Sequence, residues 1–259
     1  MSLDSYKSSV ARFFSRAAET YDGVAVMQRR VGAELMDLVP ELPMNAVVLD
    51  LGSGTGFFAE RLASQYQHAE VVALDIAEAM LRRGSVMSGL HLVLADAEAI
   101  PLATASVDLV FTNMCIQWCQ RPEHLFAELG RVLKPEGEVV FSSFGPQTLI
   151  ELREAWATID GYQHVIDFLS EESLESIVAC AGFNWGHRLS RTERVQYPGV
   201  MSLMRELKGL GALNASENRA RGVTSKGALA AMVQAYPAAN DGSILATYEV
   251  LSGRLRRGS

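Results

Sequence analysis

Cysteine is scarce in this sequence of 259 residues, which contains only Cys115, Cys119 and Cys180. An odd number of cysteines does not pair completely, and no histidine cluster accompanies the first two as a zinc site requires. We therefore expect free thiols, no disulfide framework and no bound metal.

Long apolar runs and an excess of positive charge are also missing. No stretch of about 18 uninterrupted apolar residues occurs, and the first residues lack a basic segment followed by an apolar run. The formal net charge is −7, which disfavours a surface that binds polyphosphates. These absences predict a cytoplasmic protein whose partners include neither a membrane nor a nucleic acid.

The main pattern present is an alternation of short apolar runs with amphipathic stretches between residues 46 and 145. With 49% hydrophobic and 20% charged residues, the chain suits one α/β domain with an insertion. The expected strands are 46–50, 71–75, 91–95, 107–112 and 138–142, and the expected helices are 57–63, 77–83 and 123–133. Strands joined by helical crossovers predict a Rossmann-like, doubly wound, mostly parallel sheet.

The segments outside this core, which we take as 45–145, complete a single domain over residues 1–259. Helical spacing predicts two helices within 6–39, as an N-terminal cap. After the core we expect helices 149–159 and 170–181, a strand 188–197, an insertion 198–241 with two helices, and a strand 244–251. The insertion is expected to be a substrate lid, and the sheet to have seven strands. Residues 252–259 contain too few apolar side chains to pack, which predicts a flexible tail.

Three glycines at alternate positions, Gly52, Gly54 and Gly56, lie between the first strand and its helix. Glycine permits a tight turn and a close approach of the backbone to a ligand. Asp50 precedes this loop, Ser53 lies within it, and the third glycine comes one residue earlier than in dinucleotide-binding loops. An acidic residue suits a ligand with an ammonium and a sulfonium better than a pyrophosphate. A nicotinamide-dependent dehydrogenase is therefore disfavoured.

Two further carboxylates follow the next two strands. Asp75 ends the second strand, where a carboxylate accepts hydrogen bonds from both hydroxyls of a ribose. Asp96 follows the third strand, where it is suited to accept from an adenine amine while the Ala97 amide reaches a ring nitrogen. Taken singly, each acid is also explained as a helix N-cap. Together with the glycine loop, they predict a site for an adenosine without phosphate.

These motifs resemble those of the class I methyltransferases that use S-adenosylmethionine (AdoMet). The resemblance rests on VLDLGSGTG at 48–56, ALDI at 73–76, DA at 96–97 and LKPEGE at 133–138. It implies that the glycine loop lies under the methionine moiety and that Asp75 holds the ribose. It also implies that Ile76 and Met80 pack on adenine and that Asn113 lies near the methyl group.

A narrower resemblance, to the malonyl-acyl-carrier-protein O-methyltransferases of biotin synthesis, covers most of the chain. It rests on FSRAAETY at 14–21, NMCIQWC at 113–119 and LMRELKGLGA at 203–212. The implied acceptor is the carboxylate of a malonyl thioester, on acyl-carrier protein or coenzyme A. Tyr21 and Gln28 are then candidates to cover the cofactor or substrate, and Trp118 to line the acyl channel.

A carboxylate is ionised at neutral pH, so its methylation requires positioning rather than a general base. We expect a cation for the malonyl carboxylate, and Arg205 and Lys208, three residues apart, are expected to share a helix face toward the pocket. A carrier protein is acidic, which calls for a basic docking patch. The candidates for that patch are Arg29, Arg30, Arg219, Arg221 and Lys226.

Each of these basic side chains is also explained as part of a solvated helix face without a binding role. Two other functions stay open. One is methylation of a different small acceptor, such as a quinone precursor or a free dicarboxylate. The other is a protein that binds AdoMet without catalysis, which tight binding without turnover would reveal.

Overall fold

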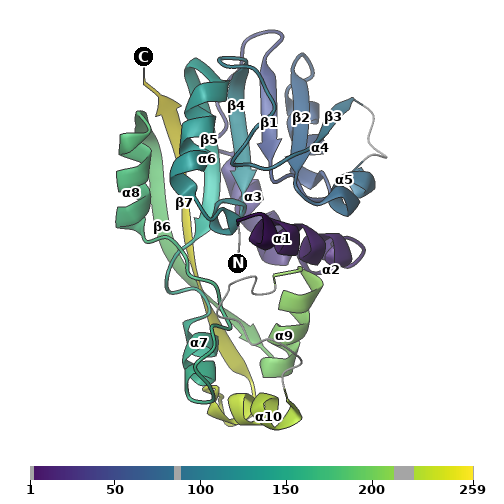
Figure 1. The fold of residues 1–259 in the computed structure, drawn as a ribbon, viewed down its shortest axis with the longest axis vertical. Coiled ribbons are helices and arrows are strands. Elements are labelled where there is room, and N and C mark those ends of the chain that lie inside the picture. The colour runs from purple at the N-terminus through teal and green to yellow at the C-terminus, as the bar shows by residue number, and fades with distance from the viewer. Residues whose placement is uncertain (1–2, 85–88, 213–224, 259) are drawn as a thin grey trace.

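The computed structural model describes residues 3–84, 89–212 and 225–258, and its centre is a seven-stranded sheet (Figure 1). The strands are β1 (Val47–Leu51), β2 (Glu70–Asp75), β3 (Leu90–Leu94), β4 (Val107–Asn113), β5 (Leu133–Phe144), β6 (Phe183–Tyr197) and β7 (Ile244–Arg257). Their order is β3-β2-β1-β4-β5-β7-β6; the first five are parallel, and β7 is antiparallel to β5 and β6. The expected doubly wound, mostly parallel, seven-stranded sheet is confirmed.

Helices connect these strands and extend the chain at both ends of the core. They are α1 (Leu3–Ala17), α2 (Tyr21–Val24), α3 (Val26–Met36), α4 (Phe57–Gln65), α5 (Glu78–Gly84), the 3-10 turn η1 (Ile116–Trp118), α6 (Pro122–Val132), α7 (Ile150–Ala157), α8 (Glu171–Cys180), α9 (Val200–Gly209) and α10 (Lys226–Ala235). Helix α8 begins where its capping residue predicts, because Ser170 Oγ accepts from the Ser173 amide at 3.2 Å.

The two faces of the sheet are covered by different helices. Phe126 of α6 and Val178 of α8 pack on one face, and Leu35 of α3 and Leu62 of α4 pack on the other. Strands that are buried on both faces read as continuous apolar runs, which is why β1 and β4 were visible in the sequence. Strands β2 and β4 lie on opposite sides of β1. The connections after β1 and β4 therefore diverge and leave a crevice at the carboxyl ends of these strands.

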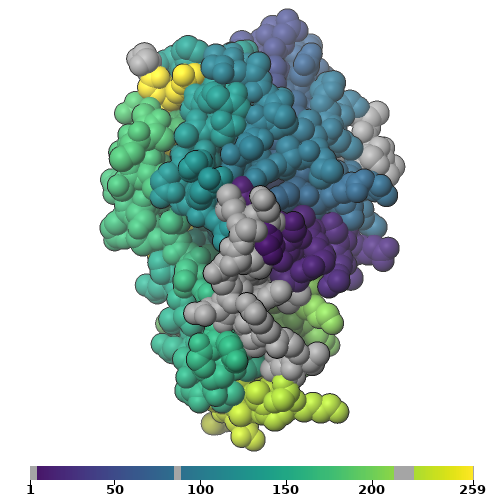
Figure 2. Space-filling model, in the orientation of Figure 1, coloured from purple at the N-terminus to yellow at the C-terminus, as the bar shows by residue number. Residues whose placement is uncertain are grey.

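The N-terminal segment covers this crevice with three helices rather than the expected two. Helix α1 packs on α5 and on the chain after β2, through Val10, Phe13 and Ile76. The second expected helix is divided at Ala25, where ψ is 44° instead of a helical value near −42°. Figure 2 shows α1, in purple, between the body of the sheet and the distant α10.

A second core lies beyond the end of β5, where β6 and β7 continue as a two-stranded arm (Figure 1). Helices α7, α9 and α10 pack on this arm through buried side chains that include Leu152, Leu203, Met232 and Ala246. Helices α9 and α10 are the two that the insertion 198–241 was expected to contain. The insertion therefore shares this second core with α7 and the two-stranded arm.

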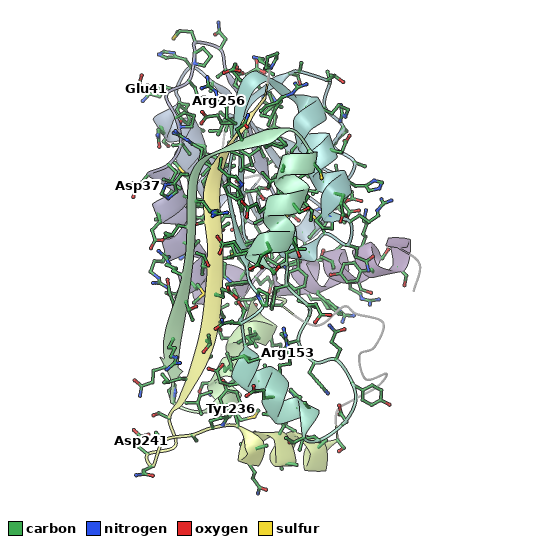
Figure 3. All side chains as sticks on the ribbon, turned by 90° about the vertical axis from the view of Figure 1, so that its left-hand side faces the viewer. Asp37, Glu41, Arg153, Tyr236, Asp241 and Arg256 are labelled. Atoms are coloured by element: carbon green, nitrogen blue, oxygen red, sulfur yellow. The ribbon has the colours of Figure 1, made fainter. Side chains whose placement is uncertain are left out.

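The prediction of a flexible tail from residue 252 is wrong. Strand β7 continues to Arg257 and pairs with β5 on one side and β6 on the other. Figure 3 shows Arg256 at the opposite end of β7 from Asp241. The segment has few apolar residues, but Leu255 is fully buried and Arg254 and Arg256 form ion pairs with Glu138 and Glu136. Because β7 is paired on both sides, its backbone N–H and C=O groups are hydrogen-bonded, and this pairing holds a segment that has few apolar side chains.

A pair of substitutions tests this assignment of the C-terminal residues. Leu255→Ala is expected to lower the free energy of unfolding by about 2–5 kcal/mol, because it leaves a cavity in the main core. Arg256→Ala, on the adjacent and exposed position, is expected to change it by less than about 1 kcal/mol. Urea denaturation of both variants measures the difference. Equal and small changes in the free energy of unfolding would support a flexible tail instead.

Candidate active site

The glycine loop turns at the carboxyl end of β1. Gly52, Gly54 and Gly56 have φ values of 74°, 56° and 83°, which L-residues with a side chain rarely adopt. The amides of Gly52 and Ser53 donate to the Leu74 carbonyl at 2.8 and 3.0 Å, which holds the loop against β2. A Cβ at Gly52 would lie 2.5 Å from Cys115 Sγ, whereas one at Gly54 would meet nothing within 4 Å. Gly52 is therefore required by packing, and Gly54 borders open space.

Asp75 connects the loop to the next strand. Its Oδ2 accepts from the Gly54 amide at 2.9 Å and its Oδ1 from the Ala77 amide at 2.7 Å. Burial raises the pKa of Asp75, although the two amides act in the opposite direction. The carboxylate is thus held in one orientation at the wall of a cavity.

Asp50 lies beneath the loop and is 2% exposed. Its Oδ2 and the Ser53 hydroxyl are buried without a hydrogen-bond partner among the described residues. Both residues border a small cavity that Gln28 and Asn113 also line. Burial, reinforced by the charge of Asp75, raises the pKa of Asp50 to about 8. An unpaired buried carboxylate and hydroxyl are costly, and a cationic ligand group would satisfy them.

A second cavity continues from the loop along the ends of β2, β3 and β4. It is lined by Gly52, Gly54, Asp75, Ile76, Met80, Asp96, Ala97, Asn113, Trp118 and further residues. The structure therefore brings together almost all of the residues that the sequence nominated for a cofactor. Gly56 is the exception, since it lies at the start of α4 and borders none of the cavities described here.

Lys7 on α1 borders the same cavity and was missed by the sequence analysis. Its ammonium is paired with Asp96 and, at 2.8 Å, with Glu98. The Lys7 and Arg121 contacts lower the pKa of Glu98 against the opposing effect of burial. The available signal was the helical spacing of Lys7 with Val10 and Phe14, because all three border this cavity.

Tyr21 lines the two cavities already described and also a third one, so the three cavities meet at this residue. Burial, with the charges of Asp75 and Asp22, raises the pKa of Tyr21, so that its hydroxyl stays a neutral donor at physiological pH. Gln28 lines two of the three cavities. The side chain of Asn113 is fixed nearby by two hydrogen bonds. Its Nδ2 donates to the backbone carbonyl of Gln28 at 2.9 Å, and its Oδ1 accepts from the Ser142 hydroxyl at 2.8 Å.

The third cavity is larger than these two and is lined mainly by apolar side chains. Concave, mostly apolar sites of this kind bind small organic ligands. Trp118 separates it from the cofactor-side cavity and packs edge-on against Phe14 at 5.1 Å. Its other walls come from α7, the segment 164–168, α9 and Tyr248. We call this space the acceptor pocket.

The expected orientation of Arg205 and Lys208 is wrong. Both are exposed, and among the described residues Arg205 donates to Met201 and Ser202 of its own helix. Helix α9 turns Glu206, Leu207 and Leu210 toward the acceptor pocket instead. The reason is the apolar stripe of α9, which must face the second core and thereby fixes the cations on the opposite side.

The candidates for a basic docking patch are dispersed. Arg29 contacts Asp22 at 3.2 Å and lies over the ring of Phe57, and Arg30 is paired with Glu193. Lys226 is exposed at the start of α10. Arg219 and Arg221 lie outside the described residues.

Among the described residues, no group of three His, Cys, Asp or Glu side chains is arranged to hold a metal ion. None of the helices in the described part of the chain is long and apolar enough to span a membrane.

Comparison with known proteins agrees with this geometry. Residues 49–141 match the methyltransferase domain family. The structure is similar to that of phosphoethanolamine N-methyltransferase 2 from Haemonchus contortus, solved with S-adenosyl-L-methionine, with a TM-score of 0.57, 16% identity and coverage of 95% of this chain and 57% of that one. The fold and the site define an AdoMet-dependent methyltransferase.

The sequence relatives are more specific. The chain is 44% identical to the malonyl-[acyl-carrier protein] O-methyltransferase of Methylococcus capsulatus, over 94% of this chain and 91% of that protein. It is also 44% identical to the biotin biosynthesis bifunctional protein BioHC of Cellvibrio japonicus, over 89% of this chain and 46% of that protein. The chain belongs to the family of malonyl-[acyl-carrier protein] O-methyltransferases, and the resemblance read from the sequence is confirmed.

Proposed function

We propose that this enzyme transfers a methyl group from AdoMet to the free carboxylate of a malonyl thioester, carried by acyl-carrier protein, in biotin synthesis. The observation that carries the proposal is an apolar acceptor pocket that meets the cofactor-side cavities at Tyr21, in a chain with close relatives of that name. The three cysteines are free thiols, as the reducing cytoplasm favours, and a cytoplasmic location is part of the proposal.

The residues of the cofactor site fit the chemical groups of AdoMet. Asp50 and Ser53, which have unsatisfied buried atoms, suit the ammonium and carboxylate of its methionine part. Asp75 suits the ribose hydroxyls, Ile76 and Met80 the faces of adenine, and Asp96 with Ala97 its polar edge. When bound, AdoMet supplies a methyl group on a positively charged sulfur.

The chain's own residues then have two tasks, to position the acceptor and to exclude water. Tyr21, Gln28 and Asn113 offer neutral donors and acceptors where the cavities meet. The surrounding walls of Phe14, Met114 and Trp118 are apolar. Opposite charges attract more strongly when water is excluded, so these walls favour the approach of an anionic acceptor to a sulfonium. No general base is needed, because the acceptor is already ionised.

The decisive experiment is methyl transfer from radiolabelled AdoMet to malonyl-acyl-carrier protein, with malonyl-coenzyme A, acetyl-acyl-carrier protein and free malonate in parallel. We expect transfer to the malonyl thioesters, fastest to the carrier protein, and none to the acetyl thioester. Transfer to free malonate at an equal rate would contradict recognition of the thioester. AdoMet binding without transfer to any of the four compounds would indicate either a different acceptor or a protein that binds AdoMet without catalysis.

The pH dependence of AdoMet binding tests the role of Asp50. Its pKa of about 8 means that the unliganded carboxyl is mostly protonated at pH 7. An ammonium bound beside it favours the charged form, so binding releases a proton and tightens as pH rises. Affinity is expected to rise up to about tenfold per unit between about pH 5 and 6.5, below the range where an α-amino group titrates.

Asp50→Asn is the matched control, because the amide keeps the shape of the side chain and does not titrate. It is expected to bind AdoMet weakly and with a flat profile over the same range in isothermal titration calorimetry. A slope that survives in this variant would assign the proton release to another group.

A further inference from the structure

His164 is an ionisable side chain of the acceptor pocket to which the catalytic proposal gives no role. Its ring stacks on Trp156 with centroids 3.7 Å apart and an interplanar angle of 6°. Trp156 is 3% exposed and belongs to the second core. The histidine ring is therefore held in one plane by a side chain that has no freedom to move.

Asp160 fixes the ring within that plane. Nε2 of His164 contacts the two carboxylate oxygens of Asp160 at 2.9 and 3.2 Å. The histidine and the Tyr162 amide lower the pKa of Asp160 against the opposing effect of burial, so the carboxylate is charged beside the ring. With Nε2 committed to Asp160, Nδ1 is the ring nitrogen left for a ligand, and no described residue is bonded to it.

The backbone around His164 is also anchored. Arg153 of α7, labelled in Figure 3, donates to the Ile166 carbonyl at 3.3 Å and so ties the segment after α7 back to that helix. Val165, Ile166 and Phe168 of the same segment line the acceptor pocket together with His164. The imidazole is thus a preorganised group on the wall of the pocket rather than part of a loose loop.

His164 is the single side chain able to carry a positive charge among the described residues that line this pocket. Arg205 and Lys208 face away from it, as shown above. Glu206 lies on another wall, where it accepts from the Tyr197 hydroxyl at 2.8 Å. A negative group there disfavours a carboxylate at that wall and leaves the wall with His164 as the favourable one.

We propose that His164 is the carboxylate-binding group of the acceptor pocket, with Nδ1–H donating to one oxygen of the malonyl carboxylate while the other oxygen faces the methyl group. This inference rests on the proposed function, since it requires a carboxylate acceptor. The free oxygen supplies the electron pair for the new C–O bond, the C–S bond breaks, and its electron pair stays on sulfur. No proton is transferred.

The arrangement separates recognition from reactivity. Because Nε2–H donates to Asp160, Nδ1 donates to the substrate when the ring carries both protons. One carboxylate oxygen accepts this directed hydrogen bond, and the other keeps its nucleophilic electron pair. The ester product has no charge and accepts a weaker hydrogen bond from Nδ1–H than the carboxylate of the substrate does. His164 thereby favours malonyl over acetyl thioesters before transfer and favours release of the product after it.

The test compares His164→Phe with the wild type, because a phenyl ring retains the stack on Trp156 and removes both nitrogens. The measurements are kcat and KM with malonyl-acyl-carrier protein, and the inhibition constant of acetyl-acyl-carrier protein. KM for the malonyl substrate is expected to rise about tenfold or more, as for loss of a charge-assisted hydrogen bond. Inhibition by the acetyl form, which has no carboxylate, is expected to be unchanged, and so is AdoMet affinity.

Asp160→Asn is the second variant, which keeps the size of the partner and removes its charge. It is expected to raise KM for the malonyl substrate in the same direction by a smaller factor. Equal weakening of the malonyl and acetyl forms in His164→Phe would overturn the proposal in favour of a contact to the thioester arm. A loss confined to kcat would overturn it in favour of a general base. A wild-type enzyme that transfers nothing to malonyl thioesters would instead remove the proposed function itself.

Discussion

Replacement of Asp75 by alanine is expected to weaken AdoMet binding by at least about 100-fold. The side chain would give two charge-assisted hydrogen bonds to the ribose, each worth about 1.5–3 kcal/mol. It also receives the amides of Gly54 and Ala77, at 2.9 and 2.7 Å, which position the glycine loop. One substitution therefore removes both a ligand contact and the support of the loop.

Isothermal titration calorimetry with AdoMet measures this effect, and two variants serve as controls. Asp75→Asn retains an acceptor oxygen and is expected to bind with an intermediate affinity. Asp108→Ala removes another carboxylate that accepts a backbone amide, from Val47 at 2.8 Å, but at the opposite end of the sheet. It is expected to leave AdoMet affinity unchanged. Wild-type affinity in Asp75→Ala would refute the placement of the ribose.

The second large effect is expected for Gly54→Ala. Its added Cβ meets nothing within 4 Å in the protein, and Gly54 lines both cavities of the proposed cofactor site, so the methyl group is expected to project toward the ligand. We expect AdoMet affinity to fall about tenfold to a hundredfold, as for overpacking by a methyl group in a tightly fitted site. The φ of 56° adds a loss of about 1–2 kcal/mol in the free energy of unfolding.

Gly52→Ala is the matched comparison, because its Cβ would lie 2.5 Å from Cys115 Sγ. The clash is inside the protein, so the larger loss is expected in stability. Thermal denaturation without ligand, together with calorimetric titration, separates the two variants. Equal losses of stability and affinity in both would mean that the loop responds as a unit and that Gly54 does not border the ligand.

The sequence by itself determined where the strands of the parallel sheet lie along the chain and where the glycine loop turns. Strands β1 and β4 are buried on both faces, which leaves an unbroken apolar run that is readable without a structure. Gly52, Gly54 and Asp75 were visible for a related reason, because backbone geometry and strand ends restrict the residue types at these positions. Constraints of this kind act within a few residues of the chain, so the local sequence is enough to predict them.

The tertiary structure alone decided which side chains face the acceptor. Arg205 and Lys208 were expected in the pocket, but the apolar stripe of α9 packs on the second core and turns them to solvent. Lys7 meets Asp96 and Glu98 from a segment that is distant in sequence. His164 lines the acceptor pocket together with residues of α9 and β7.

The C-terminal residues give the same lesson in the other direction. Residues 252–259 have few apolar side chains and were therefore expected not to pack. They are held by pairing with β5 and β6, which no local sequence pattern reveals. Burial in these cases depends on the sum of contacts from separate segments. The direction of a side chain at a long-range contact is therefore set only when the chain has folded.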